Sequence, residues 1–137
     1  MPNNIAQLPK KAEENKVKIK ILCNLTDDEL VTFYSGAIAT IFCPHLEPFG
    51  LVSLESMACG TPVIGVNEAG LRESISNDKT GFLLPWDEGL FAEKISYLIS
   101  NPSKHKEMRS NCLSYINDDY WGWHFFVQRL SKLLDKN

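Results

Sequence analysis

The stretch that most constrains the fold runs from Glu47 to Pro62 and reads EPFGLVSLESMACGTP. It follows the apolar run Ala37–Cys43, which is typical of a strand buried on both faces. A short helical pattern begins near Gly50 and stops at Gly60-Thr61-Pro62, so the chain reads strand, turn, helix and helix stop. The turn therefore follows the carboxyl end of a buried strand, where open α/β sheets bind ligands.

Two acids, Glu47 and Glu55, bracket this turn with seven residues between them. Glu47 precedes the helix, and Glu55 lies about two turns into it. A helix that begins at residues 49–51 directs unpaired backbone N–H groups toward the turn, and such groups suit a phosphate. From the residues alone, Pro48 and Gly50 could instead only shape a βα turn, and Glu55 could be an exposed helix charge.

Strand and helix patterns alternate on both sides of this stretch. Val17–Leu22 alternates apolar and polar residues with the period of a strand, and Thr26–Glu29 has the capping-box pattern that starts a helix. Val63–Val66 and Phe82–Leu84 are further short apolar runs. The sequence therefore predicts strands at about 17–22, 37–43, 63–66 and 82–84 in a parallel, Rossmann-like sheet with helices on both faces.

The two ends of the chain have weaker or purely helical patterns. Residues 1–16 are either a polar leader or a short helix that begins at Pro9. From Asp87 onward the pattern is wholly helical, and the aromatic cluster Tyr120–Phe126 opens a last helix. That cluster could pack the helix or stack on a carbohydrate. We expect one partial domain (1–137) with a leader (1–16), an α/β core (17–86) and a helical tail (87–137).

The run EPFGLVSLESMACGTPVI closely resembles the signature of the family 4 retaining glycosyltransferases. The preceding TDDELVTFYSGAIATIFCP and the following VNEAGLRESISNDKTGFLLP extend the match over roughly residues 17–85. The resemblance implies part of the C-terminal, donor-binding domain of a GT-B enzyme. Such an enzyme moves a sugar from a nucleotide-diphosphate sugar to an acceptor hydroxyl, with no metal and no cofactor beyond this co-substrate.

The resemblance also assigns roles to residues. It implies that Glu47 is catalytic and contacts hydroxyls of the transferred sugar, and that Glu55 accepts hydrogen bonds from the two ribose hydroxyls. A carboxylate suits a diol because two acceptor oxygens meet two donors. His45 is expected to line the sugar pocket rather than act as a base, because the leaving phosphate takes the acceptor proton. The donor-binding residues expected around these acids are His45, Pro48, Phe49, Gly50, Leu51, Glu68 and Gly70, although Glu68 could equally be a solvated loop acid.

The composition of the chain limits the classes of partner and the cellular locations that we expect for it. The net charge of −3 argues against a nucleic-acid partner, and no apolar run approaches the length of a membrane span. The polar N-terminus lacks the apolar segment of a signal peptide, so we expect a cytoplasmic protein. The four cysteines form no CxxC pair, which favours buried free thiols in a reducing compartment over disulfides or metal ligands.

Family members carry an Arg and a Lys before this region, and these cations neutralise the donor phosphates. Here Arg72, Arg109 and Arg129 all follow the glutamate pair. We therefore expect an excised piece, a truncated product or half of a split enzyme, inactive alone. It would need the missing N-terminal acceptor domain, a partner chain or self-association. The alternative is a non-catalytic module that binds nucleotide sugars or another protein.

Overall fold

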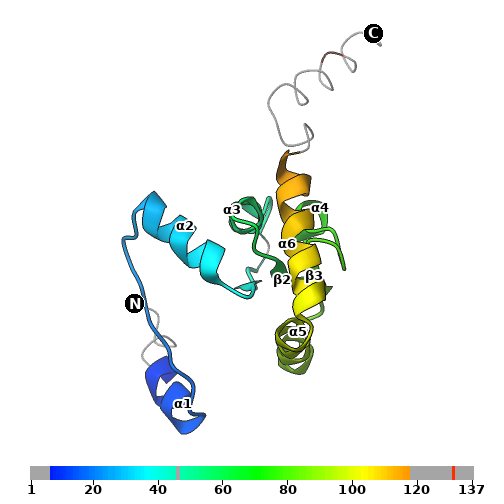
Figure 1. Cartoon of the computed structure of the whole chain (residues 1–137). Helices are drawn as coiled ribbons and strands as arrows, with labels where there is room; N and C mark the ends of the chain where they lie inside the picture. Colours follow the sequence, from blue (N-terminus) through cyan, green and yellow to red (C-terminus); the bar gives the residue numbers. More distant parts are fainter. Residues whose placement is uncertain (1–6, 46, 118–130, 132–137) are drawn as a thin grey trace.

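The computed structural model describes residues 7–45, 47–117 and 131. Its centre is a three-stranded parallel sheet with the order β1-β2-β3 (Figure 1). The strands are β1 (Thr40–Phe42), β2 (Val63–Val66) and β3 (Gly81–Leu84). Ile41 pairs with Ile64, which pairs with Phe82. These three strands confirm the predicted parallel sheet.

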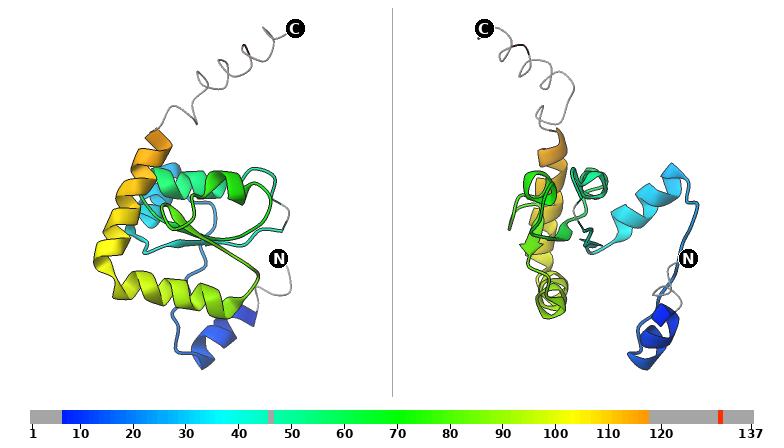
Figure 2. Two further views of the ribbon diagram at one scale, coloured as in Figure 1. Left: turned by 90° about the vertical axis from the view of Figure 1, so that its right-hand side faces the viewer. Right: turned by 180° about the vertical axis from the view of Figure 1, so that it is seen from behind.

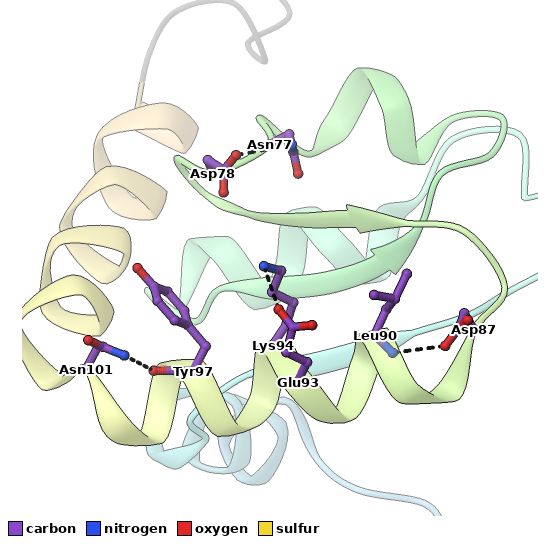
Figure 3. A network of polar contacts seen from close by, with 8 residues as sticks. All are labelled: Asn77, Asp78, Asp87, Leu90, Glu93, Lys94, Tyr97 and Asn101. Atoms are coloured by element: carbon purple, nitrogen blue, oxygen red, sulfur yellow. Dashed lines mark hydrogen bonds and ion pairs between the residues drawn. The ribbon is translucent and has the colours of Figure 1, made fainter.

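One face of the sheet is covered by α5 (Glu88–Ser100). Ile41, Ile64 and Phe82 share this face because they are paired in register. The Phe82 ring lies edge-on to Tyr97 of α5, with 6.1 Å between the ring centroids. Figure 3 shows how α5 is held at both ends: the Asp87 carboxylate accepts from the Leu90 N–H at 3.0 Å, and the Asn101 amide donates to the Tyr97 carbonyl at 2.8 Å.

The opposite face is covered by α3 (Leu51–Ala58). Thr40 points to this face, and its Oγ1 accepts a hydrogen bond from Ser56 Oγ of α3 at 2.8 Å. The helix ends in a Schellman arrangement, in which the Gly60 N–H donates to the Met57 carbonyl and the Thr61 N–H to the Ser56 carbonyl. With helices on both faces, all four residues of β2 are buried.

Two further helices complete the packed region, and Figure 2 shows their places beside the sheet. The short α4 (Leu71–Ser74) follows β2, and the long α6 (Pro102–Asn117) packs against both α3 and α5. The core that they enclose is made of apolar side chains exposed by at most a few per cent: Met57, Val63, Ile64, Val66, Leu71, Ile75, Phe82, Leu98, Met108 and Cys112.

The N-terminal region is organised differently, as α1 (Leu8–Glu14) and α2 (Asp27–Gly36) lie on one side, apart from α4, α5 and α6 (Figures 1 and 2). The short helix expected at Pro9 is present as α1, with the proline in its first turn. The predicted capping box is also confirmed, because Thr26 Oγ1 accepts from the Glu29 N–H and the Glu29 carboxylate accepts from the Thr26 N–H.

The predicted strand at Val17–Leu22 is wrong. These residues have no strand assignment, and the side chains of Val17, Ile19 and Ile21 are 56%, 46% and 51% exposed. The alternation is suitable for a strand, but a strand also needs a neighbour to complete its hydrogen bonds. In the described part of the chain, this segment has no such neighbour.

The expectation of buried cysteines is only partly right. All four are free thiols, but Cys23 and Cys43 are exposed and Cys59 is half-buried, which leaves only Cys112 buried. Burial raises the pKa of Cys112 to about 12. Across the described ranges, none of the helices has the length and apolar character needed to cross a bilayer. The helix predicted from Tyr120–Phe126 lies outside the described residues.

Candidate functional site

Two loops meet at the carboxyl ends of β1 and β2. The Gly70 N–H donates to the Glu47 carbonyl at 3.1 Å. A Cβ on Gly70 would lie only 2.4 Å from the Pro48 carbonyl oxygen, so the close approach of the loops requires glycine here. This contact confirms the predicted placement of Glu47 and Gly70 at one edge of the sheet.

The Glu47 carboxylate is held by the backbone at the start of α3. Its Oε1 accepts from the Gly50 N–H at 3.1 Å and from the Phe49 N–H at 3.4 Å. Gly50 is the N-cap of the helix and has a φ of 79°, a left-handed conformation that favours glycine. The expectation that these N–H groups are unpaired is therefore wrong at Phe49 and Gly50, because Glu47 itself occupies them.

The buried hydroxyls of Ser53 and Ser74 stabilise the loop that leads into α3. Ser53 Oγ donates to the Gly50 carbonyl and lies 2.7 Å from Ser74 Oγ of α4. Both serines are fully buried, so the bond joins the first turn of α3 to α4 without access for water. Sequence reasoning missed this brace because serine in a helical pattern carries no signal for a specific partner.

Glu55 lies further along α3, on its exposed side, and faces α2. Burial raises the pKa of the Tyr34 hydroxyl in α2, and the negative charge of the nearby Glu55 carboxylate raises it further. The Tyr34 carbonyl also accepts from Thr61 Oγ1, which ties the last turn of α2 to the loop after α3. The sequence indicated Tyr34 only as an apolar helix residue.

The ends of all three strands contribute to a second group of side chains, formed by His45, Glu68 and Trp86. The indole Nε1 of Trp86 donates to Glu68 Oε1 at 2.7 Å. The rings of Trp86 and His45 lie 6.5 Å apart at an interplanar angle of 61°. Trp86 was not predicted, although its position directly after Pro85, at the end of a strand, was a usable signal.

The other predicted site residues lie on open surface beside these groups. Phe49 and Leu51 are 52% and 59% exposed, and Pro48 is exposed in the same loop. Within residues 7–45 and 47–117, no cluster of three or more His, Cys, Asp or Glu side chains is placed to hold a metal ion.

Neither described arginine contacts Glu47. Arg72 donates through Nε and Nη2 to the Asn67 carbonyl. Arg109 of α6 donates to the carbonyls of Ser35 and Ala37 at the end of α2. Arg129 lies outside the described residues. Both described arginines are thus bonded to backbone carbonyls, and neither takes the place of the Arg and Lys that the resemblance puts before this region.

A family model described as "Glycosyl transferases group 1" matches residues 4–114. The chain belongs to this family. As a group 1 glycosyltransferase chain it has the α/β architecture of the Rossmann-like domains in GT-B enzymes, as predicted.

Curated relatives of this group 1 chain are much longer than it is. The α-1,3/1,6-mannosyltransferase ALG2 of Dictyostelium discoideum is 28% identical over 97% of the chain, which spans 32% of that relative. A D-inositol 3-phosphate glycosyltransferase of Acidothermus cellulolyticus is 36% identical over 69% of the chain, which spans 21% of that relative. The chain thus spans about a third or less of these relatives.

Solved structures agree on the fold. The C-terminal domain of a group 1 glycosyltransferase (LpcC) from Francisella tularensis has a TM-score of 0.76 at 24% identity, with coverage of 87% of this chain and 63% of that one. Anabaena Alr3699/HepE in complex with UDP has a TM-score of 0.73 at 22% identity, with coverage of 97% of this chain and 37% of that one. At these identities the similarity shows the fold.

Proposed function

We propose that the chain supplies the donor-binding site of a retaining glycosyltransferase, which transfers a sugar from a nucleotide-diphosphate sugar to an acceptor hydroxyl. The observation that carries the proposal is the joined pair of loops at the carboxyl ends of β1 and β2, with Glu47 at the start of α3 and Glu55 further along the same helix. Two solved structures of similar fold, from Anabaena, hold UDP and UDP-glucose, which supports a ligand of this class.

The two glutamates then have separate tasks. In the unliganded chain the Phe49 and Gly50 N–H groups hold the Glu47 carboxylate at the start of α3. With donor bound, this carboxylate accepts from hydroxyls of the transferred sugar, whose ring gains positive character as its bond to phosphate breaks. Glu55 accepts the ribose hydroxyls, and its charge acts on the nearby Tyr34 of α2. His45, Glu68 and Gly70 line the sugar end. The leaving phosphate takes the acceptor proton, and no metal is needed.

Catalysis by this chain alone is expected to be very weak. A phosphate leaving group needs nearby cations, and Arg72 and Arg109 are bonded to backbone carbonyls elsewhere. We propose that the cations that neutralise the donor phosphates come from a further domain, a partner chain or a second copy, which also supplies the acceptor surface.

The test is a titration with nucleoside diphosphates, followed by protein NMR, on Glu55→Gln and Glu47→Gln. Loss of the charged partner of two hydroxyls is expected to cost about 1.5–3 kcal/mol for Glu55→Gln. Glu47→Gln should cost much less with the sugar-free ligand. Equal losses in two folded variants would contradict this division of tasks.

The engaged arginines also favour a second candidate, a non-catalytic module that binds nucleotide sugars or another protein. A transfer assay separates the two functions. Transferase activity on addition of a polypeptide that carries the missing cations and acceptor domain supports the enzyme. Donor binding without any transfer under those conditions supports the module. For either function, the free thiols fit a reducing, cytoplasmic setting.

A further inference from the structure

Trp86 is the most exposed aromatic side chain at the strand ends, with 56% of its surface open. An exposed tryptophan on a loop would ordinarily sample several orientations, but this one is anchored. Its indole N–H donates to Glu68 at 2.7 Å, and its ring lies edge-on to His45. A large apolar ring is therefore presented to solvent in a defined orientation by residues from the ends of β1 and β2.

We propose that Trp86 is a sugar-binding residue of the candidate site, on whose indole the apolar face of a pyranose ring packs. The proposal rests on the proposed function. A pyranose combines an apolar C–H face with a rim of hydroxyls. The indole matches the face. The carboxylate of Glu68 has acceptor capacity beyond the indole bond and matches the hydroxyls.

The position of Trp86 favours a sugar over a nucleobase. Trp86 contacts His45, which lies two residues before Glu47 at the sugar end of the site. Glu55, assigned to the ribose, lies four residues beyond the start of α3, or about 6 Å along its axis. The nucleoside is thus expected along α3, away from the cluster of His45, Glu68 and Trp86.

The experiment measures the affinity of three pairs of ligands for the whole chain: UDP and UDP-glucose, GDP and GDP-mannose, and ADP and ADP-glucose. For the pair that binds, Trp86→Ala should weaken the nucleotide sugar about tenfold and leave the nucleoside diphosphate within about twofold. Glu68→Ala should have a smaller effect of the same kind, because the ring remains but loses its anchor. Phe33→Ala removes an aromatic ring of α2, 44% exposed, and is the matched control with no effect.

A second measurement follows the indole N–H signal of Trp86 by NMR, assigned by its absence in Trp86→Phe. Nucleotide sugar should shift this signal, and the corresponding nucleoside diphosphate should not. A shift caused by methyl α-glucoside or methyl α-mannoside alone would assign the ring to the acceptor sugar, which also supports the proposal.

Three results would overturn the inference while the proposed donor site stands: equal affinity of wild-type protein for both ligands of a pair, no effect of Trp86→Ala, or equal loss for both ligands. Equal loss would indicate a nucleobase contact or a structural role. Failure of the wild-type chain to bind any of the six ligands would instead refute the proposed donor site, and the inference with it.

Discussion

The region after β1 and the region before it use the same kinds of side chain with opposite outcomes. Ile64 in β2 is fully buried, whereas Ile19 in the extended segment is 46% exposed. Both lie in apolar patterns suitable for strands. Ile64 has a paired strand on each side and a helix over each face, while Ile19 has none of these within the described residues. The difference teaches that neighbours, rather than the residue itself, decide burial.

The two regions are joined by α6. Arg109 donates to the carbonyls of Ser35 and Ala37, and also to Thr61 Oγ1. A ring nitrogen of His105 lies 2.9 Å from the Ile38 carbonyl. A cation at the carboxyl end of α2 also complements the helix dipole. Among the described residues, these contacts attach the N-terminal region through its last residues, next to the amino ends of β1 and β2.

The largest difference is expected in thiol reactivity. Cys112 is buried in the packed region and has a pKa raised to about 12 by burial, whereas Cys23 is exposed in the N-terminal region. With iodoacetamide and mass spectrometry, Cys23 should react at least about 10³-fold faster, because Cys112 must wait for unfolding. In urea the two rates should converge. Similar rates in the folded protein would show that the packed region opens easily.

A matched pair of substitutions tests the comparison directly. Ile64→Ala should lower the free energy of unfolding by about 2–5 kcal/mol, because it leaves a cavity in the core. Ile19→Ala should change it by about 0.5 kcal/mol or less. Urea denaturation measures both. A loss of several kcal/mol for Ile19→Ala would mean that this segment is packed against another surface in solution, such as a second copy.

Arg109→Ala tests the joint between the regions. Loss of its charged hydrogen bonds should cost about 1.5–3 kcal/mol. Amide exchange in α2 should rise, while exchange in β2 should follow only the global loss. Lys106 is an exposed cation on the same helix, so Lys106→Ala is the control and should change neither the free energy of unfolding nor amide exchange in α2. Unchanged exchange in α2 would show that other contacts hold the N-terminal region.

The smallest effect concerns the start of α2. Thr26→Ala removes the capping box and should destabilise that helix by about 1 kcal/mol. If α2 opens independently of the sheet, hydrogen exchange of its amides should quicken, and the urea midpoint of the whole chain should hardly move. Thr26→Ser keeps the acceptor and should behave as wild type. A shift of the urea midpoint that matches the whole loss of about 1 kcal/mol would show that the two regions unfold as one cooperative unit.

Much of the packed region could be predicted because its signals are local. Val63–Val66 matches β2, and the Gly60 stop ends α3 as expected. The strand at Val17–Leu22 could not be judged in this way, since strand formation depends on a partner elsewhere. The division of the domain into leader, core and tail stays a prediction.

The candidate site was predicted in outline for the same reason. The positions of Glu47 and Gly70 after successive strands indicated the edge of the sheet at which their loops meet. The binding and catalytic roles of the site residues stay predictions. The contacts between loops could not be read from spacing: the brace of Ser53 with Ser74 and the bond of Trp86 to Glu68 both join residues distant in sequence. Nor does any local pattern reveal that a carboxylate caps the helix it precedes.

Under the proposed function, that cap turns ligand binding at the start of α3 into an exchange of partners. The Phe49 and Gly50 N–H groups already donate to the Glu47 carboxylate. An anionic ligand that binds to these two N–H groups must therefore first displace the negatively charged Glu47 side chain. Affinity for simple phosphate is thereby lowered, while the loop keeps its shape in the unliganded state. A ligand that also offers hydroxyls to the released carboxylate gives it a new partner, and such a ligand is selected over phosphate alone.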